Sequence, residues 1–267
     1  MLKDITLGQY FPGDTPAHRL DPRTKLILVV LYIVALFSAK SFVSYGLTAL
    51  TLLLCVKVSK VGWKPLIRGL KPVVFIVVFT GLLNMFMTPG EPLVQLGFLK
   101  ITGAGLVNAA RMVLRIMLLI MGTFLLTYTT SPIALTDGLE RLMNPLKKLR
   151  VPVHELAMVM SIALRFIPTL IEETDKIMSA QKARGADFES GNLVQRAMAM
   201  LPILVPLFIS AFRRADELAV AMECRCYHGG EGRTRLRVLK YEGRDYIALA
   251  AGCVLTAAVL VLGHFGL

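Results

Sequence analysis

Five long runs of apolar residues, each nearly free of charge, constrain the fold of this chain most strongly. A helix needs roughly 20 apolar residues to cross about 30 Å of hydrocarbon. Because the runs are shorter than this, residues on either side of each run must extend it to form a membrane span. With 55% hydrophobic residues and a mean hydropathy of +0.63, the 267-residue chain is too apolar for a soluble protein. The sequence therefore predicts an all-α membrane protein with about five transmembrane helices, over residues 26–39, 42–56, 73–87, 112–128 and 246–262.

The distribution of lysine and arginine predicts how these helices are oriented. Several basic residues precede the first run and others lie in residues 57–71, whereas the alternate loops hold only Lys40 and Lys100. Basic residues concentrate in cytoplasmic loops, so the N-terminus is predicted to be cytoplasmic and the C-terminus external. Residues 131–244, which carry 17 of the 30 basic residues, then form a cytoplasmic segment between the fourth and fifth helices.

The predicted organisation of this multi-pass cell-membrane protein has three parts. Residues 1–130 hold an N-terminal cytoplasmic segment and four transmembrane helices, residues 131–244 form long, kinked amphipathic helices, and residues 245–267 form the last transmembrane helix. The positive-inside bias and contact with anionic lipid heads explain the basic segment. Nucleic-acid binding is not expected, because no basic stretch is interleaved with aromatic residues that stack on bases.

Proline and glycine divide the cytoplasmic segment into three helical pieces. Prolines inside the second and third pieces remove backbone hydrogen bonds and are expected to kink them. Residues 197–212 carry no charge but span only about 24 Å, so we expect them to lie along the membrane interface or to pack against the second piece. If they cross instead, a cysteine placed at position 190 is labelled from outside. The pieces are expected over residues 131–150, 151–184 and 192–227.

Two further features belong to the membrane part. Residues 88–102 contain prolines, glycines and an alternating apolar pattern that predicts a short external hairpin. Residues 103–130 predict a long helix with Arg111 and Arg115 on one face. No acidic residue in the spans is available to pair with them. We expect Arg111 near the outer interface and Arg115 either snorkelling or facing a polar surface of a neighbouring helix.

The second and third cytoplasmic pieces end in the same pattern. The spacing Asp-x-Ile/Leu-x-x-Ala-x-x-x-Arg ends the second piece at Arg184 and recurs to end the third at Arg225. Gly185 follows the first arginine where a glycine commonly closes a helix, and Gly229 and Gly230 follow the second within a turn's length. The sequence thus predicts two similar helices, each ending in an arginine tip.

Small residues flank both arginines and favour docking to a partner outside the bilayer. Small neighbours let a guanidinium enter a groove, where it can pair bidentately with a carboxylate. The alternative is that each arginine only interacts with the C-terminal end of its helix dipole, which does not predict the repeat. The predicted docking residues are Ala183, Arg184, Gly185, Cys224, Arg225 and Cys226.

Catalytic motifs and a cofactor site are not predicted. The alternation of Cys224, Cys226 and His228 suggests a metal, but a structural zinc site usually needs four ligands. The chain has no phosphate-binding loop, no nucleophile elbow and no His-Glu-x-x-His helix. We therefore expect neither an enzyme nor hydrolysis of nucleotide by this chain itself.

Short motifs from about His18 to Arg244 cover almost the whole chain and are specific as a set. They are His18-x-Leu20-Asp21-Pro22-Arg23-Thr24-Lys25-Leu26, Thr130-Ser131-Pro132, Pro152-Val153-His154-Glu155-Leu156, Ala163-Leu164-Arg165-Phe166-Ile167-Pro168, Gln181-x-Ala183-Arg184-Gly185-Ala186, Ala211-Phe212-Arg213-Arg214-Ala215-Asp216-Glu217-Leu218-Ala219 and Gly232-Arg233-Thr234-Arg235. In these motifs the chain resembles the transmembrane T component of energy-coupling factor transporters, the EcfT/CbiQ family.

The resemblance implies a membrane scaffold for ATP-driven uptake of vitamins or metal ions. Its partners would be two cytoplasmic ATP-binding-cassette ATPases and a small substrate-binding membrane subunit, which alone would recognise the cargo. In that family, Ala-Arg-Gly-like motifs at the ends of long coupling helices fit grooves in the ATPases. They correspond here to Ala183-Arg184-Gly185 and Cys224-Arg225-Cys226, of which the second departs from the pattern on both sides of the arginine.

Two other classes of function serve as alternatives. A self-contained secondary transporter would need a charged or broken-helix site near the midplane, for which the sequence offers only Arg111 and Arg115 without an acidic partner. An integral membrane enzyme would need a nucleophile with its base, or a metal centre, and neither is found in the sequence.

Overall fold

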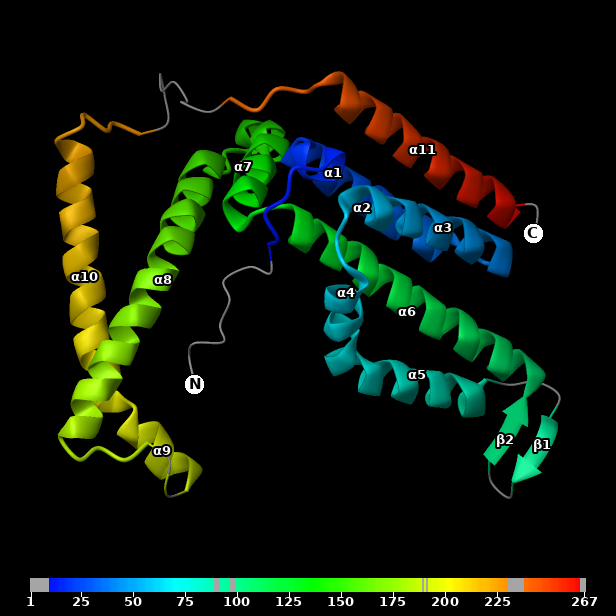
Figure 1. The fold of residues 1–267 in the computed structure, drawn as a ribbon, viewed down its shortest axis with the longest axis horizontal. Coiled ribbons are helices and arrows are strands. Elements are labelled where there is room, and N and C mark those ends of the chain that lie inside the picture. Colours follow the sequence, from blue (N-terminus) through cyan, green and yellow to red (C-terminus); the bar gives the residue numbers. More distant parts are fainter. Residues whose placement is uncertain are drawn as a thin grey trace. The chain divides into compact units, whose positions relative to one another are not determined.

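The computed structural model describes residues 10–88, 92–96, 99–188, 190, 192–229 and 238–264. Helices form every described element except one two-stranded hairpin, so the predicted all-α fold is confirmed (Figure 1). The chain divides into two compact units. The larger unit comprises residues 8–142 and 238–267, and the smaller unit comprises residues 1–7 and 143–237.

The first two predicted spans form a pair of helices joined at Ala39 and Lys40 in the larger unit. Asp21 caps the first helix, in which Pro22 occupies the first position, and Ser41 caps the second helix by accepting the backbone N–H of Ser44. The elements of this unit are α1 (Pro16–Arg19), α2 (Pro22–Ser38), α3 (Phe42–Ser59), α4 (Trp63–Leu70), η2 (Lys71–Val73), α5 (Val74–Met87), β1 (Pro92–Leu96), β2 (Leu99–Thr102), α6 (Gly103–Thr129), α7 (Pro132–Leu142) and α11 (Gly243–His264).

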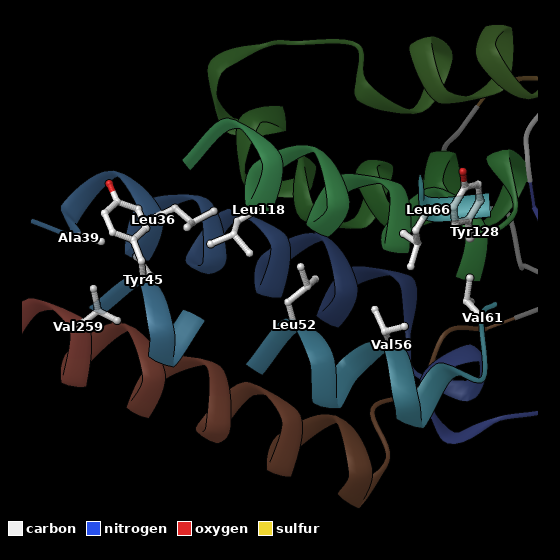
Figure 2. Packing of buried hydrophobic residues seen from close by; sticks show 11 residues of the cluster. Leu36, Ala39, Tyr45, Leu52, Val56, Val61, Leu66, Leu118, Tyr128 and Val259 are labelled. Atoms are coloured by element: carbon white, nitrogen blue, oxygen red, sulfur yellow. The ribbon is translucent and has the colours of Figure 1, made fainter. Parts of the chain in front are cut away.

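The core of the larger unit lies between α2, α3, α6 and α11 (Figure 2). Two glycines let these helices approach closely. A β-carbon at Gly122 on α6 would lie 2.5 Å from the Tyr32 ring, and one at Gly252 on α11 would lie 2.5 Å from Leu28. Small residues at helix contacts are the usual means by which membrane helices pack. The buried side chains include Leu36, Tyr45, Leu52, Val56, Leu118, Tyr128 and Val259.

A polar cluster joins the starts of α2 and α11, although these lie far apart in sequence. The carboxylate of Asp21 accepts hydrogen bonds from the backbone N–H and the guanidinium of Arg23, and the backbone N–H of Asp21 donates to Asp245. The Arg23 guanidinium lies 3.9 Å from the centroid of the Tyr241 ring. Burial raises the pKa of Asp21, but the hydrogen bonds and charge of Arg23 outweigh it and lower that pKa.

The hairpin predicted within residues 88–102 is confirmed as an antiparallel pair of strands. Val94 pairs with Ile101 and Leu96 with Leu99, with an irregularity between Pro92 and Val94. The hairpin connects α5 to α6.

Six helical stretches in the described part of the chain are long and apolar enough to cross a membrane. The sequence predicts about five spans, and the predicted spans differ from these six stretches at α2 and in the smaller unit. Helix α2, with 17 residues, is a predicted span that is too short to be among the six. Two stretches of the smaller unit join the set instead. The six are Phe42–Ser59, Trp63–Phe86, Gly103–Thr129, Val153–Ala183, Val194–Glu223 and Gly243–Gly263.

The smaller unit contains η3 (Asn144–Leu149), α8 (Val153–Ala183), α9 (Leu193–Ala199) and α10 (Leu201–Glu223). Helix α8 begins directly after Pro152, as predicted, and continues through Pro168. The third predicted piece is wrong as a single helix, because the chain breaks at Met200 between α9 and α10. Pro202 occupies the first turn of α10, where its missing N–H needs no partner, so it starts this helix rather than kinking it.

Candidate functional site: two arginine-ended helices

The first arginine tip closes α8 with a complete set of capping hydrogen bonds. Gly185 follows Arg184 with a φ of +90°, in the left-handed region that favours glycine. Its N–H donates to the carbonyl oxygen of Lys182 at 3.0 Å, and the N–H of Ala186 donates to that of Gln181 at 3.0 Å. This pair of bonds is the Schellman motif, and it confirms that Gly185 ends the helix.

The second tip reproduces this geometry one residue after its own arginine. The N–H of Cys226 donates to the carbonyl oxygen of Glu223 at 2.9 Å, and the N–H of Tyr227 donates to that of Met222 at 3.1 Å. Cys226 has a φ of +54° and therefore takes the position of Gly185. These bonds are complete at Tyr227, where the third piece is predicted to end, and Gly229 lies beyond them. Gly230 and residues 232–235 of the last motif lie outside the described residues.

Each arginine thus precedes a residue that turns the backbone away from the helix axis. Arg184 and Arg225 are both exposed. The small residues around them, Ala183, Gly185, Cys224 and Cys226, are exposed as well, so none of the described side chains of the smaller unit covers either tip. Among the residues that the structure describes, no group of three or more His, Cys, Asp or Glu side chains is placed to hold a metal ion.

The two tips lie on helices that pack in opposite directions. The side-chain amide of Gln181, near the end of α8, donates to the carbonyl oxygen of Pro202, near the start of α10, at 3.3 Å. Glu173 accepts from the Ser210 hydroxyl at 2.7 Å and pairs with the guanidinium of Arg214. The end of α8 therefore packs against the start of α10, and earlier residues of α8 pack against later residues of α10. The two helices are antiparallel (Figure 1).

The antiparallel packing places the arginine tips at opposite ends of the helix pair. Gln181, about one turn before Arg184, contacts Pro202 near the start of α10, whereas Arg225 follows the end of the same helix. At 1.5 Å per residue, these ends are about 35 Å apart along α10. The structure therefore brings Ala183, Arg184 and Gly185 together as one tip and Cys224, Arg225 and Cys226 as another, but it does not bring the two tips together.

Sequence reasoning missed the role of the acidic residues before Arg184. By themselves, Glu172, Glu173 and Asp175 suggest a solvated helix face with charge pairs along the same helix. The structure instead pairs Glu173 across to α10, which fixes the register of the two helices. The two adjacent basic residues Arg213 and Arg214 were the signal available in the sequence. Opposite charges on two separate helices do not show, however, which acidic residue pairs with which basic residue.

An exposed apolar stripe runs along α10 on the side opposite to these contacts. Its six side chains follow the helical repeat and range from 43% exposed at Leu204 to 69% exposed at Phe212. Ser210 and Arg214, which contact Glu173, lie about half a turn away from the stripe. Neither α8 nor α9 covers it. The stripe consists of Leu201, Leu204, Val205, Phe208, Ile209 and Phe212.

These observations define a class of protein: a multi-pass helical membrane protein that carries two exposed, arginine-ended helices. Comparison with known proteins agrees. The family model of the cobalt transport protein CbiQ matches residues 13–236. The energy-coupling factor transporter transmembrane protein EcfT of Clostridium kluyveri is 57% identical over 257 residues, which cover 96% of this chain and 95% of that relative.

Two further relatives give the same result. The EcfT protein of Thermosediminibacter oceani is 53% identical, covering 97% of this chain and 98% of its own length. That of Bacillus subtilis is 51% identical, covering 98% of this chain and 99% of its own length. The chain therefore belongs to the family of energy-coupling factor transporter transmembrane proteins, EcfT, within the CbiQ family. It is a membrane component of a transporter and not an enzyme.

Proposed function

We propose that this chain is the scaffold and energy-coupling subunit of an ATP-driven uptake transporter for vitamins or metal ions. In this proposal it links two ABC ATPases to a substrate-binding membrane subunit. The observation that carries the proposal is the shared closing geometry at Arg184 and Arg225. Two exposed guanidiniums held at equivalent positions on separate helices are suited to enter equivalent grooves on two related proteins.

The distance between the tips favours two docked ATPases rather than one. About 35 Å along α10 is comparable to the length of a 20-residue helix, or about the diameter of a small domain. A single groove does not reach over such a distance. Each ATPase therefore binds one tip, and the contact between Glu173 and Arg214 transmits movement of one helix to the other.

The stripe on α10 is the surface that we assign to the substrate-binding membrane subunit. It is apolar, continuous and turned away from α8. On a helix of a membrane protein, such a stripe contacts either lipid or another apolar helix, and we assign it to a helix of the partner. A membrane subunit offers complementary apolar helices, so the same helix that ends in Arg225 would contact the subunit that holds the cargo.

The mechanism in this proposal is mechanical. ATP binding and hydrolysis move the grooves that hold the tips, the helices tilt, and the substrate-binding subunit reorients to release its cargo inside. Coupling requires that the tips bind more tightly in one nucleotide state than in the other, since equal affinity for both states shifts nothing.

The proposal also fixes the orientation in the cell membrane. Residues 131–244 and the N-terminus face the cytoplasm, where the ATPases are. Helices α8 and α10 are apolar enough to cross a membrane, but α8 carries Glu172, Glu173 and Asp175 in its second half, which favours an interfacial or cytoplasmic position. Labelling of a cysteine introduced at position 190 from the outside would contradict this orientation.

Transport in reconstituted vesicles tests the proposed function. An Arg184→Glu, Arg225→Glu double variant is expected to lose ATP-dependent uptake while it still inserts into the membrane, because a carboxylate repels the acidic groove. Arg165→Glu makes the same charge change at another exposed position of α8 and should transport normally. Full uptake by the double variant would exclude the docking role, and uptake by the purified chain without ATPases would favour a secondary transporter.

A further inference from the structure

Three basic residues gather at the turn between α2 and α3. Arg115 on α6 donates from Nε to the Tyr45 hydroxyl at 2.9 Å and from its terminal nitrogen to the carbonyl oxygen of Ala39 at 3.2 Å. This confirms the prediction that Arg115 faces a polar surface of neighbouring helices. Arg111 lies one turn away with its guanidinium 5.4 Å from the centroid of the Phe42 ring. Lys40 lies exposed in the turn itself.

The described residues do not fill the hydrogen-bonding capacity of this cluster. Nε of Arg111 is buried and has no hydrogen-bond partner among the residues that the structure describes. A buried donor without an acceptor costs free energy, more so for a charged group. Arg115 places two of its nitrogens on neutral oxygens of Tyr45 and Ala39, which bind the guanidinium without neutralising its charge.

The sequence supplies almost no acid for this end of the larger unit. Glu91 is the single Asp or Glu between Pro22 and Thr136, and it lies outside the described residues. Asp21 and Asp245 lie at the other ends of α2 and α11. Three cations therefore share one end of the helices, although an external end is where basic residues are normally scarce.

The depth of the cluster follows from the helix lengths. The Lys25 ammonium donates to the carbonyl oxygen of Thr129 at 2.9 Å, so the start of α2 and the end of α6 lie at the same level. From that level Arg115 is about 21 Å and Arg111 about 27 Å along α6. The hydrocarbon core is about 30 Å thick. With Thr129 placed at the inner boundary of this core, arginine side chains from these two positions reach the outer layer of lipid headgroups.

We propose that Lys40, Arg111 and Arg115 bind the phosphate of a phospholipid headgroup. A guanidinium pairs with phosphate through two parallel hydrogen bonds, and phosphates are the abundant anions at this depth. The rings beside the cations are open to the membrane, since Phe37 is 60% and Phe42 is 47% exposed, and they provide apolar surface for the acyl chains. In the proposed orientation the lipid belongs to the outer leaflet. The lipid site itself does not depend on the transport function.

Native mass spectrometry of the purified chain with phosphatidylglycerol tests this site. An Arg111→Gln, Arg115→Gln double variant is expected to bind one lipid at least about tenfold more weakly, which is the loss of one or two charge-assisted hydrogen bonds. Because Arg115 also holds Tyr45 and Ala39, the single variant Arg111→Gln serves as the second test and is expected to lose about fivefold. Arg68→Gln removes an exposed arginine from α4 and should bind the lipid as the wild type does.

Two further arms identify the source of the phosphate. Millimolar inorganic phosphate should leave the bound lipid in place, and a diglucosyl diacylglycerol of the same acyl chains, which lacks phosphate, should bind at least about tenfold more weakly. Equal binding of phosphatidylglycerol by wild type and Arg111→Gln would overturn the proposal. Displacement by inorganic phosphate, or equal binding of the glycolipid, would also overturn it, in favour of a free anion or of apolar contact alone.

Discussion

Replacing Gly185 by alanine tests whether the shape of the first tip, and not only its charge, holds Arg184 for docking. The φ of +90° at this position is one that a residue with a β-carbon rarely adopts. A β-carbon built there meets nothing within 4 Å, so the cost is confined to the backbone. That cost is about 1–2 kcal/mol. It corresponds to an increase of about 5- to 30-fold in the fraction of molecules with an open tip.

Hydrogen exchange measured by mass spectrometry reports this opening directly. The amides of residue 185 and Ala186 are bonded to the carbonyl oxygens of Lys182 and Gln181, and both are expected to exchange about 5- to 30-fold faster in Gly185→Ala. Gly229→Ala is the matched control. Its φ of +101° imposes a similar strain, again with nothing within 4 Å, but it lies beyond the bonds that close α10.

The variant Arg184→Gln separates the effect of the arginine charge from the effect of the backbone conformation at the tip. It leaves the backbone of the tip intact, so its exchange should equal that of the wild type while ATPase binding is lost. Unchanged exchange in Gly185→Ala would refute the reasoning, because it would mean that the left-handed backbone at this position is not what closes the helix.

Three further predictions concern other parts of the chain. Cys226 occupies a left-handed position, so the Tyr227 amide should exchange about fivefold more slowly in Cys226→Gly than in Cys226→Ala; equal rates would show that the residue is not strained. Phe208→Asp should weaken copurification of the substrate-binding subunit at least about tenfold without affecting the ATPases, because it charges the stripe on α10. Arg23 holds the pKa of Asp21 below its usual value of about 4, so this contribution to stability is present at neutral pH and is lost as the pH falls below about 4. Thermal unfolding in detergent between pH 3 and 7 should show this loss as a lower unfolding temperature of the wild type at low pH. In Asp21→Asn the unfolding temperature should depend less on pH.

Local signals in the sequence were sufficient to predict the elements that end at strong breakers. Pro152 marks the start of α8 and Gly185 its end, and the charged Lys40 between two apolar runs marks the turn of the α2–α3 hairpin. In each case the residue itself restricts the backbone or resists burial. The prediction therefore needed no knowledge of the tertiary structure.

Features that depend on tertiary packing or on unusual backbone conformations were not predictable in this way. Cys226 closes the second tip in a left-handed conformation, which the sequence Cys-Arg-Cys does not predict because this conformation favours glycine. The pairing of Glu173 with Arg214 depends on the register between two helices. Length and apolarity alone also do not decide whether α8 and α10 cross the membrane or lie along it.

The number of ATPase subunits bound to the purified chain tests the central claim most directly. Two exposed arginine tips at opposite ends of an antiparallel helix pair predict a mass with two ATPases for the wild type. The same reasoning predicts one ATPase for Arg184→Glu or Arg225→Glu alone and none for the double variant. Two ATPases retained by the double variant would contradict the account, because the tips would then not be the docking points.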